Sequence, residues 1–154
     1  MGERLTTGEM CTRIVTIAFR ATSLPEAARL MREQHVGCLV VVEDGADGMR
    51  RVVGLLTDRD IVTAVVAPGL DPAALTAGDV MSREVVTVQE DDSLIDLMRT
   101  MRAQGVRRVP VLGGRGELVG IATLDDVLAI LSEELSLLVG AVEREGQREQ
   151  RQRR

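Results

Sequence analysis

The chain has 154 residues, enough for one domain of ordinary size or for two small halves that share a core. Its 45% apolar and 28% charged residues exclude wholesale disorder, and no apolar run approaches the roughly 20 residues of a membrane-spanning helix. The net charge of −5 and the single aromatic residue, Phe19, argue against a nucleic-acid partner.

Residue types that catalysis needs are scarce. The chain contains no lysine and one histidine, His35, so a Schiff-base lysine is excluded and a metal site built on several histidines is excluded as well. We therefore expect no enzymatic activity, no required cofactor and no metal. The N-terminus lacks an apolar signal segment, and Cys11 and Cys38 follow no paired pattern, so we expect a cytoplasmic protein with reduced thiols.

In chain order, the first elements are a strand, a helix and two strands. Residues 13–17, "RIVTI", form a short apolar strand, and Ser23 is a good cap for a helix that runs to about Gln34. Residues 37–42 and 51–56 are β-branched runs joined by a Gly/Asp-rich turn, which predicts a hairpin. A second helix begins at Thr57.

The same order follows a second time. It comprises a strand at 84–88, a helix from Ser93, a hairpin over 107–122 and a helix from Thr123. The intervening segment contains two prolines and two glycines and reads as a connection. We divide the chain into a first repeat (7–68), a connection (69–77), a second repeat (78–137), and a helix end with a flexible charged tail (138–154).

The two copies align residue by residue. Ser23, Leu24 and Met31 fall on positions 93, 94 and 101, an offset of 70 residues, where the same residue types recur. "GLLTDRDIV" starts at Gly54 and "GIATLDDVL" at Gly120, an offset of 66, because the first hairpin turn is longer. Two tandem copies of one structural unit explain both offsets.

Each copy carries a Thr-x-x-Asp motif where a strand passes into a helix. In one interpretation, Thr57 with Asp60 and Thr123 with Asp126 are capping boxes, in which threonine and aspartate satisfy free backbone N–H groups. In the other, the helix start and the threonine bind a phosphate while the carboxylate accepts hydroxyl groups of a ribose. The spacing alone leaves both open.

The repeated order of elements, the two Thr-x-x-Asp motifs, and the segments "GDVMSREVVTV", "GVRRVPVL" and "VGIATLDDVL" resemble a tandem pair of CBS domains, the arrangement called a Bateman module. The resemblance covers roughly residues 7–137. It implies an α+β fold of two β-α-β-β-α repeats with pseudo-two-fold symmetry. It also implies a cleft that binds an adenosyl ligand such as AMP, ADP, ATP, NAD or S-adenosylmethionine, with AMP first among them.

The resemblance assigns roles to specific residues. Asp60 and Asp126 would hold the ribose in two related sites, with Thr57 and Thr123 beside the ribose or phosphate. Arg107 and Arg108 occupy a place where the family often has phosphate-binding residues. The first copy has Gly37 and Cys38 there, so the two sites are unequal. The slot for the base would be formed by Val15, Thr16, Val86 and Thr87.

The last helix carries an apolar stripe that is longer than one repeat needs. Leu128, Leu131, Leu135, Leu138 and Val142 step by three and four residues, and beyond Leu135 we expect a second copy of the chain as partner. The resemblance implies a disc-like homodimer. After Glu143 the apolar periodicity stops, and we expect a frayed, solvated end.

Together these features predict a regulatory nucleotide-sensing module that acts on a separate protein, whose identity the sequence does not give. The alternative is a ligand-independent dimeric adaptor in which both Thr-x-x-Asp motifs only cap helices.

Overall fold

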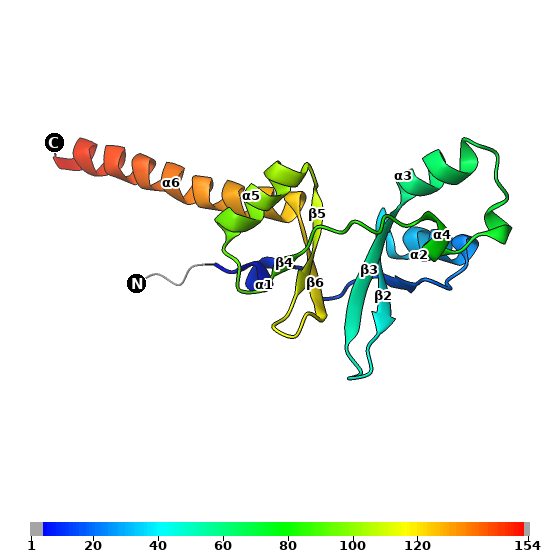
Figure 1. Cartoon of the computed structure of the whole chain (residues 1–154). Coiled ribbons are helices and arrows are strands. Elements are labelled where there is room, and N and C mark those ends of the chain that lie inside the picture. The colour runs from blue at the N-terminus through cyan, green and yellow to red at the C-terminus, as the bar shows by residue number, and fades with distance from the viewer. Residues whose placement is uncertain (1–4, 153–154) are drawn as a thin grey trace.

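The computed structural model describes residues 5–152 as two halves that lie side by side, with the last helix projecting away from the second half (Figure 1). The first half has a three-stranded sheet, helices over it, and a π-helical turn, η1, that continues α3. Its elements are β1 (Ile17–Phe19), α2 (Leu24–Gln34), β2 (Cys38–Asp44), β3 (Arg50–Thr57), α3 (Asp58–Ile61) and η1 (Val62–Val66).

The second half repeats this plan with a longer final helix. A short 3₁₀ turn, η2, lies in the connection between the two halves. The elements are η2 (Pro72–Ala74), β4 (Val88–Gln89), α5 (Leu94–Gln104), β5 (Arg108–Leu112), β6 (Leu118–Thr123) and α6 (Leu124–Gln152). In each sheet the first strand is parallel to the second, and the second is antiparallel to the third. The predicted α+β fold of two tandem repeats is confirmed.

Two local expectations were wrong. The opening strands begin later than predicted, at Ile17 and Val88, because the preceding residues cross between the halves. The sequence analysis also missed two four-residue helices, α1 (Thr7–Met10) and α4 (Ala77–Val80), whose capping boxes start at Thr6 and Thr76. They are too short to show apolar periodicity.

Each short helix packs against the other half of the molecule. In α1, Thr7 N–H donates to the Asp92 carbonyl at 2.8 Å and Gly8 N–H donates to the Glu90 carbonyl at 2.9 Å. In α4, Ala77 N–H and Gly78 N–H donate to the carbonyls of residues 22 and 20, at 2.8 and 2.9 Å. Each repeat is thus completed by the helix that precedes the opening strand of the other.

The two apolar cores follow the same exchange. Ala77 and Met81 are buried in the first core with Leu24, Leu39 and Leu56. In the second core, Cys11 is buried together with Leu97, Val109, Val111, Ala122 and Val127. Because each core takes residues from both sides of the connection, neither repeat buries its own core alone.

The glycine of the repeated phrase is a packing requirement. A Cβ at Gly54 would meet the Met81 sulfur, and one at Gly120 would meet the Cys11 sulfur and lie 2.9 Å from the Thr12 carbonyl oxygen. Backbone pairs run beside these contacts: Leu55 with Ser82, and Thr12 with Ile121. The incoming segment therefore lies so close to β3 or β6 that only glycine fits.

Helix α6 continues to Gln152, so the segment after Glu143, for which we expected a frayed and solvated end, is helical. Glu, Gln and Arg are good helix formers, so the polar tail extends the helix without an apolar face of its own. Leu135, Leu138 and Val142 are 62%, 64% and 69% exposed. None of the helices in the described part of the chain combines the length and apolar character of a membrane span.

Candidate functional site: a cavity between the repeats

A crossing segment, residues 12–16, forms one wall of the candidate site. At its start, Thr12 exchanges two backbone hydrogen bonds with Ile121 in β6, at 2.9 and 3.0 Å. At its end, the Thr16 carbonyl accepts a hydrogen bond from Val40 N–H in β2 at 3.2 Å. The segment therefore spans both sheets and faces residues of both repeats.

Beside this segment lies an open cavity of about 270 Å³. This volume is just below the range of roughly 300–1,000 Å³ that is usual for small-ligand pockets. Both repeats contribute to the lining, which comprises Thr12, Ile14, Val15, Thr16, His35, Val36, Gly37, Cys38, Arg108, Ile121, Thr123 and Asp125.

One side of the cavity is aliphatic. Ile14 is 94% exposed although it is a large apolar side chain, and Val15, Val36 and Ile121 lie in the same lining. Exposed apolar surface next to a concave site with polar groups is typical of a ligand-binding pocket. This wall could cover a flat heterocyclic base.

The polar part of the lining lies around the start of α6. Thr123 pairs in register with Arg108, and both line the cavity. Thr123 N–H and its hydroxyl donate to Asp126 Oδ2 at 3.2 and 2.7 Å, and Asp126 N–H donates to Thr123 Oγ1 at 3.2 Å. The predicted capping box is present, and it orients the threonine at the cavity wall.

The first repeat has the same cap. Thr57 N–H donates to Asp60 Oδ2 at 2.8 Å, and Asp60 N–H donates to Thr57 Oγ1 at 3.1 Å. Within residues 5–152, the Oδ1 atoms of Asp60 and Asp126 have no hydrogen-bond partner. Capping therefore uses one oxygen of each carboxylate and leaves the other able to accept hydrogen bonds.

Cys38 is the first residue of β2. It pairs in register with Thr57 and lines the cavity. Burial raises the pKa of the Cys38 thiol to about 11; the Arg108 charge lowers it, and Asp60 and Asp58 raise it. The thiol is therefore neutral and a weak nucleophile at physiological pH.

Two neighbouring arginines differ in what they face. Arg108 lines the cavity, whereas Arg107 lies at its rim, with Nη2 3.8 Å from Asp125 Oδ1. The side chains of Arg107 and Asp125 are 72% and 80% exposed, so this ion pair is weak and easily exchanged for another anion.

The structure brings some of the predicted site residues together and leaves others apart. Val15, Thr16, Cys38, Arg108 and Thr123 line the cavity. Asp126 is bonded to Thr123 and so adjoins it. The remaining predicted residues, which do not line this cavity, are Thr57, Asp60, Val86, Thr87 and Arg107.

Sequence reasoning missed several lining residues, among them Ile14, His35, Val36 and Asp125. Only Ile14 carried a signal, because it sits beside Val15 in a segment that we expected to be a buried strand.

The repeat offsets assign to each lining residue an equivalent position in the other repeat, and some of these equivalent residues are chemically different. Ile14 corresponds to Glu84 (14 + 70), and Asp125 corresponds to Arg59 (125 − 66). The two sides share the fold but not the chemistry: this cavity has the exposed aliphatic wall, and its counterpart carries a carboxylate at that place.

The fold agrees with comparisons to known proteins. The CBS-domain family matches residues 8–67 and 77–133, so the chain belongs to the CBS-domain family and carries two repeats of it. Proteins built from such pairs are generally regulatory and ligand-binding.

Two relatives are similar over most of the chain. Hypoxic response protein 1 of Mycobacterium tuberculosis is 38% identical over 119 residues, which are 77% of this chain and 80% of that protein. MK0525 of Methanopyrus kandleri is 34% identical over 123 residues, 80% of this chain but only 61% of that longer protein.

Solved structures give the same result. An uncharacterized conserved protein from Pyrococcus horikoshii superposes with a TM-score of 0.72 at 32% identity, over 84% of this chain and 94% of that one. Hypoxic Response Protein I, described with two coordinated zinc ions, superposes with a TM-score of 0.71 at 35% identity, over 81% of this chain and 98% of that one. In the described residues 5–152, no group of three or more His, Cys, Asp and Glu side chains could hold a metal ion.

Proposed function

We propose that this protein is a regulatory module that binds an adenine nucleotide in the cavity between its repeats, with AMP as the first candidate and ADP, ATP, NAD or S-adenosylmethionine as the others. Occupancy of the cavity is then conveyed to a separate protein. A ligand that contacts both repeats can shift their arrangement, provided that it binds one arrangement more tightly than the other.

The observation that carries this proposal is a lining in which both repeats supply aliphatic and polar side chains. Ile14, which is exposed to solvent, would be covered by the base, as would Val36 and Ile121. Thr123 lines the same cavity, and its partner Asp126 has an unpaired Oδ1.

Arg108 in the cavity supports a phosphate group as part of the ligand. Arg107 at the rim is held only by an exposed ion pair with Asp125, so it can turn to an anion at low cost. The aliphatic side chains would suit a base, the Asp126 carboxylate beside Thr123 would suit a ribose, and the Arg108 guanidinium would suit a phosphate.

Isothermal titration with AMP, ATP, NAD and S-adenosylmethionine tests the proposal. We expect saturable binding of AMP, weakened at least about tenfold in Asp126→Ala because hydrogen bonds to a charged group are lost. Asp60→Ala, in the related motif outside this cavity, should keep that binding. A thermal melt of each variant verifies that it is folded.

Ile14→Ser tests the aliphatic wall and has a matched control. We expect about tenfold weaker binding of AMP, since burial of an aliphatic side chain contributes roughly 1.5–3 kcal/mol. Glu84→Ser changes the corresponding position of the other repeat and should leave the affinity within about twofold. Equal effects of the two substitutions would count against the cavity as the binding site.

A ligand-independent adaptor is the second candidate, and the complete capping boxes favour it, because they give both Thr-x-x-Asp motifs a structural task. Two results together would support the adaptor function: no nucleotide binds, and Asp126→Ala only lowers the unfolding free energy by about 1 kcal/mol.

A further inference from the structure

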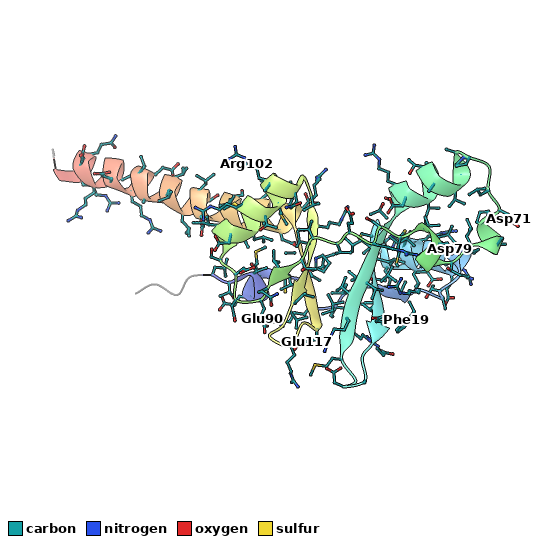
Figure 2. All side chains as sticks on the ribbon, viewed as in Figure 1. Phe19, Asp71, Asp79, Glu90, Arg102 and Glu117 are labelled. Atoms are coloured by element: carbon teal, nitrogen blue, oxygen red, sulfur yellow. The ribbon has the colours of Figure 1, made fainter. Side chains whose placement is uncertain are left out.

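The apolar stripe of α6 (Leu128, Leu131, Leu135, Leu138 and Val142) extends beyond the half to which it belongs. Leu131 packs against the core of the second half, and the family match ends at residue 133. Leu135, Leu138 and Val142 are each more than 60% exposed. The later part of α6 projects beyond the body of the molecule (Figure 2). An apolar stripe of this length on one helix face needs a partner.

We propose that this overhang pairs with α6 of a second copy, running antiparallel, with Leu138 packed against the partner's Val142 and Val142 against the partner's Leu138. In this register the numbers of facing stripe positions add to 280, so the contact is centred on residue 140, and the pairs on the two flanks add to 282 and 278. The same patch is used on both copies, as a two-fold symmetric dimer requires.

The residues beside the stripe fit a second copy. Along one flank of α6, at steps of seven residues, lie Glu134, Ala141 and Arg148. When two helices cross antiparallel about a two-fold axis, equal flanks meet. Glu134 then faces the partner's Arg148, Arg148 faces the partner's Glu134, and the small Ala141 at the centre permits close approach. This flank is thus complementary to itself in charge.

The other flank supports the same register. Val139, which is 58% exposed, lies on that flank and would pack against the partner's Val139. The apolar contact therefore extends to one side of Leu138 and Val142, while the ion pairs close the other side.

The charge distribution along α6 selects the antiparallel direction. From Leu124 to Val142 the helix has four carboxylates and no arginine, whereas its arginines are Arg144, Arg148 and Arg151. A parallel pair would place Glu145 and Glu149, which continue the spacing of the stripe, against the same residues of the partner. Antiparallel pairing avoids these like-charge contacts and lays the arginines along the acidic part of the partner.

Sedimentation velocity of the full chain over a range of concentrations tests the apolar contact. We expect the protein to dimerise, and Leu138→Asp to raise the dissociation constant of the dimer about 100-fold, because two unpaired carboxylates enter the contact. Leu137→Asp is the matched control: Leu137 is 73% exposed but points away from the stripe, so dimerisation should change less than about threefold. A monomeric wild type, or equal effects of the two substitutions, would overturn the proposal.

A charge exchange tests direction and register. Glu134→Arg and Arg148→Glu should each raise the dissociation constant about tenfold, and the double variant should return it to within about threefold of wild type. The two positions are 14 residues apart, about 21 Å along one helix, so they can compensate each other only between antiparallel copies. A double variant that is weaker than either single variant would contradict the pairing. The nucleotide titration is independent of this result.

Discussion

The two repeats have the same order of strands and helices, yet they differ at the lining of the cavity and in the length of the last helix. Features that occur twice build the fold: the capping boxes at Thr57 and Thr123, the glycines of the repeated phrase, and the exchange of α1 and α4 between the halves. Features that occur once are not needed for the fold. Ile14 has no apolar counterpart, and Arg107 and Arg108 stand where the first repeat has Gly37 and Cys38.

The final helices differ as much as the cavities. In the first repeat the helix that starts after Thr57 ends at Val66 with the π-helical turn η1. In the second repeat the corresponding helix, α6, runs to Gln152. The same strand-to-helix junction therefore leads to a short helix covering its own half and to a long helix that leaves its half. The part of α6 beyond the repeat is the part for which we propose pairing with a second copy.

The largest expected effect tests the features shared by both repeats. Gly120→Val should lower the unfolding free energy by about 2–3 kcal/mol, because the new side chain would overlap Cys11 and the Thr12 carbonyl in a packed core. Gly54→Val should have an effect of similar size. Urea unfolding measures both.

Gly114→Val is the control for these substitutions, since a Cβ at Gly114 would meet no atom within 4 Å. If Gly120→Val were no more destabilising than this control, the close approach of the crossing segment to β6 would be refuted.

The next effect concerns Cys38, which stands where the second repeat has Arg108. Its pKa is raised from 9.0 to about 11, so above pH 9 the unfolded chain loses a thiol proton that the folded chain keeps, and stability falls as pH rises. We expect the unfolding free energy to drop by about 1 kcal/mol from pH 8 to pH 10. Burial raises the pKa of Cys11 as well, which adds to the fall.

The chain is well suited to this measurement because it contains neither lysine nor tyrosine, the other side chains that titrate in this range. Cys38→Ser should reduce the slope of stability against pH and leave the part due to Cys11. An unchanged slope in Cys38→Ser would show that the thiol is not desolvated in the folded protein.

A smaller effect compares the ends of α2 and α5. Both helices end in a left-handed residue, His35 with φ of 54° and Gly105 with φ of 65°. Because glycine adopts this conformation without a Cβ penalty, His35→Gly should raise the unfolding free energy by about 0.5–1 kcal/mol.

Gly105→Ala should lower the unfolding free energy by a similar amount, since it introduces the Cβ that His35→Gly removes. Thermal melts of both variants measure these changes in stability. Destabilisation by His35→Gly would mean that the imidazole contributes a contact that its backbone geometry does not reveal.

The smallest effect on stability is expected at the arginine that the first repeat lacks. Arg107→Ala breaks only an exposed ion pair, so the unfolding free energy should stay within about 0.5 kcal/mol of wild type. If Arg107 meets a phosphate of the ligand, the affinity for AMP should fall while the affinity for adenosine stays the same. Equal losses for both ligands would exclude that role.

By itself the sequence determined the repeat, the order of strands and helices, and the junctions at Thr57 and Thr123, because these depend on local periodicity, turn residues and caps. The resemblance to CBS domains also marked Val15, Thr16, Cys38, Arg108 and Thr123, five of the residues that line the cavity.

Only the tertiary structure decided how the halves share their elements. The hydrogen bonds from α1 to residues 90 and 92 join positions more than 80 residues apart, and no local pattern encodes such a contact. The same exchange carries the segment with Ile14 from one sheet to the other and leaves its side chain exposed in the cavity. A motif predicts what a segment forms, but which surfaces meet depends on how the whole chain packs.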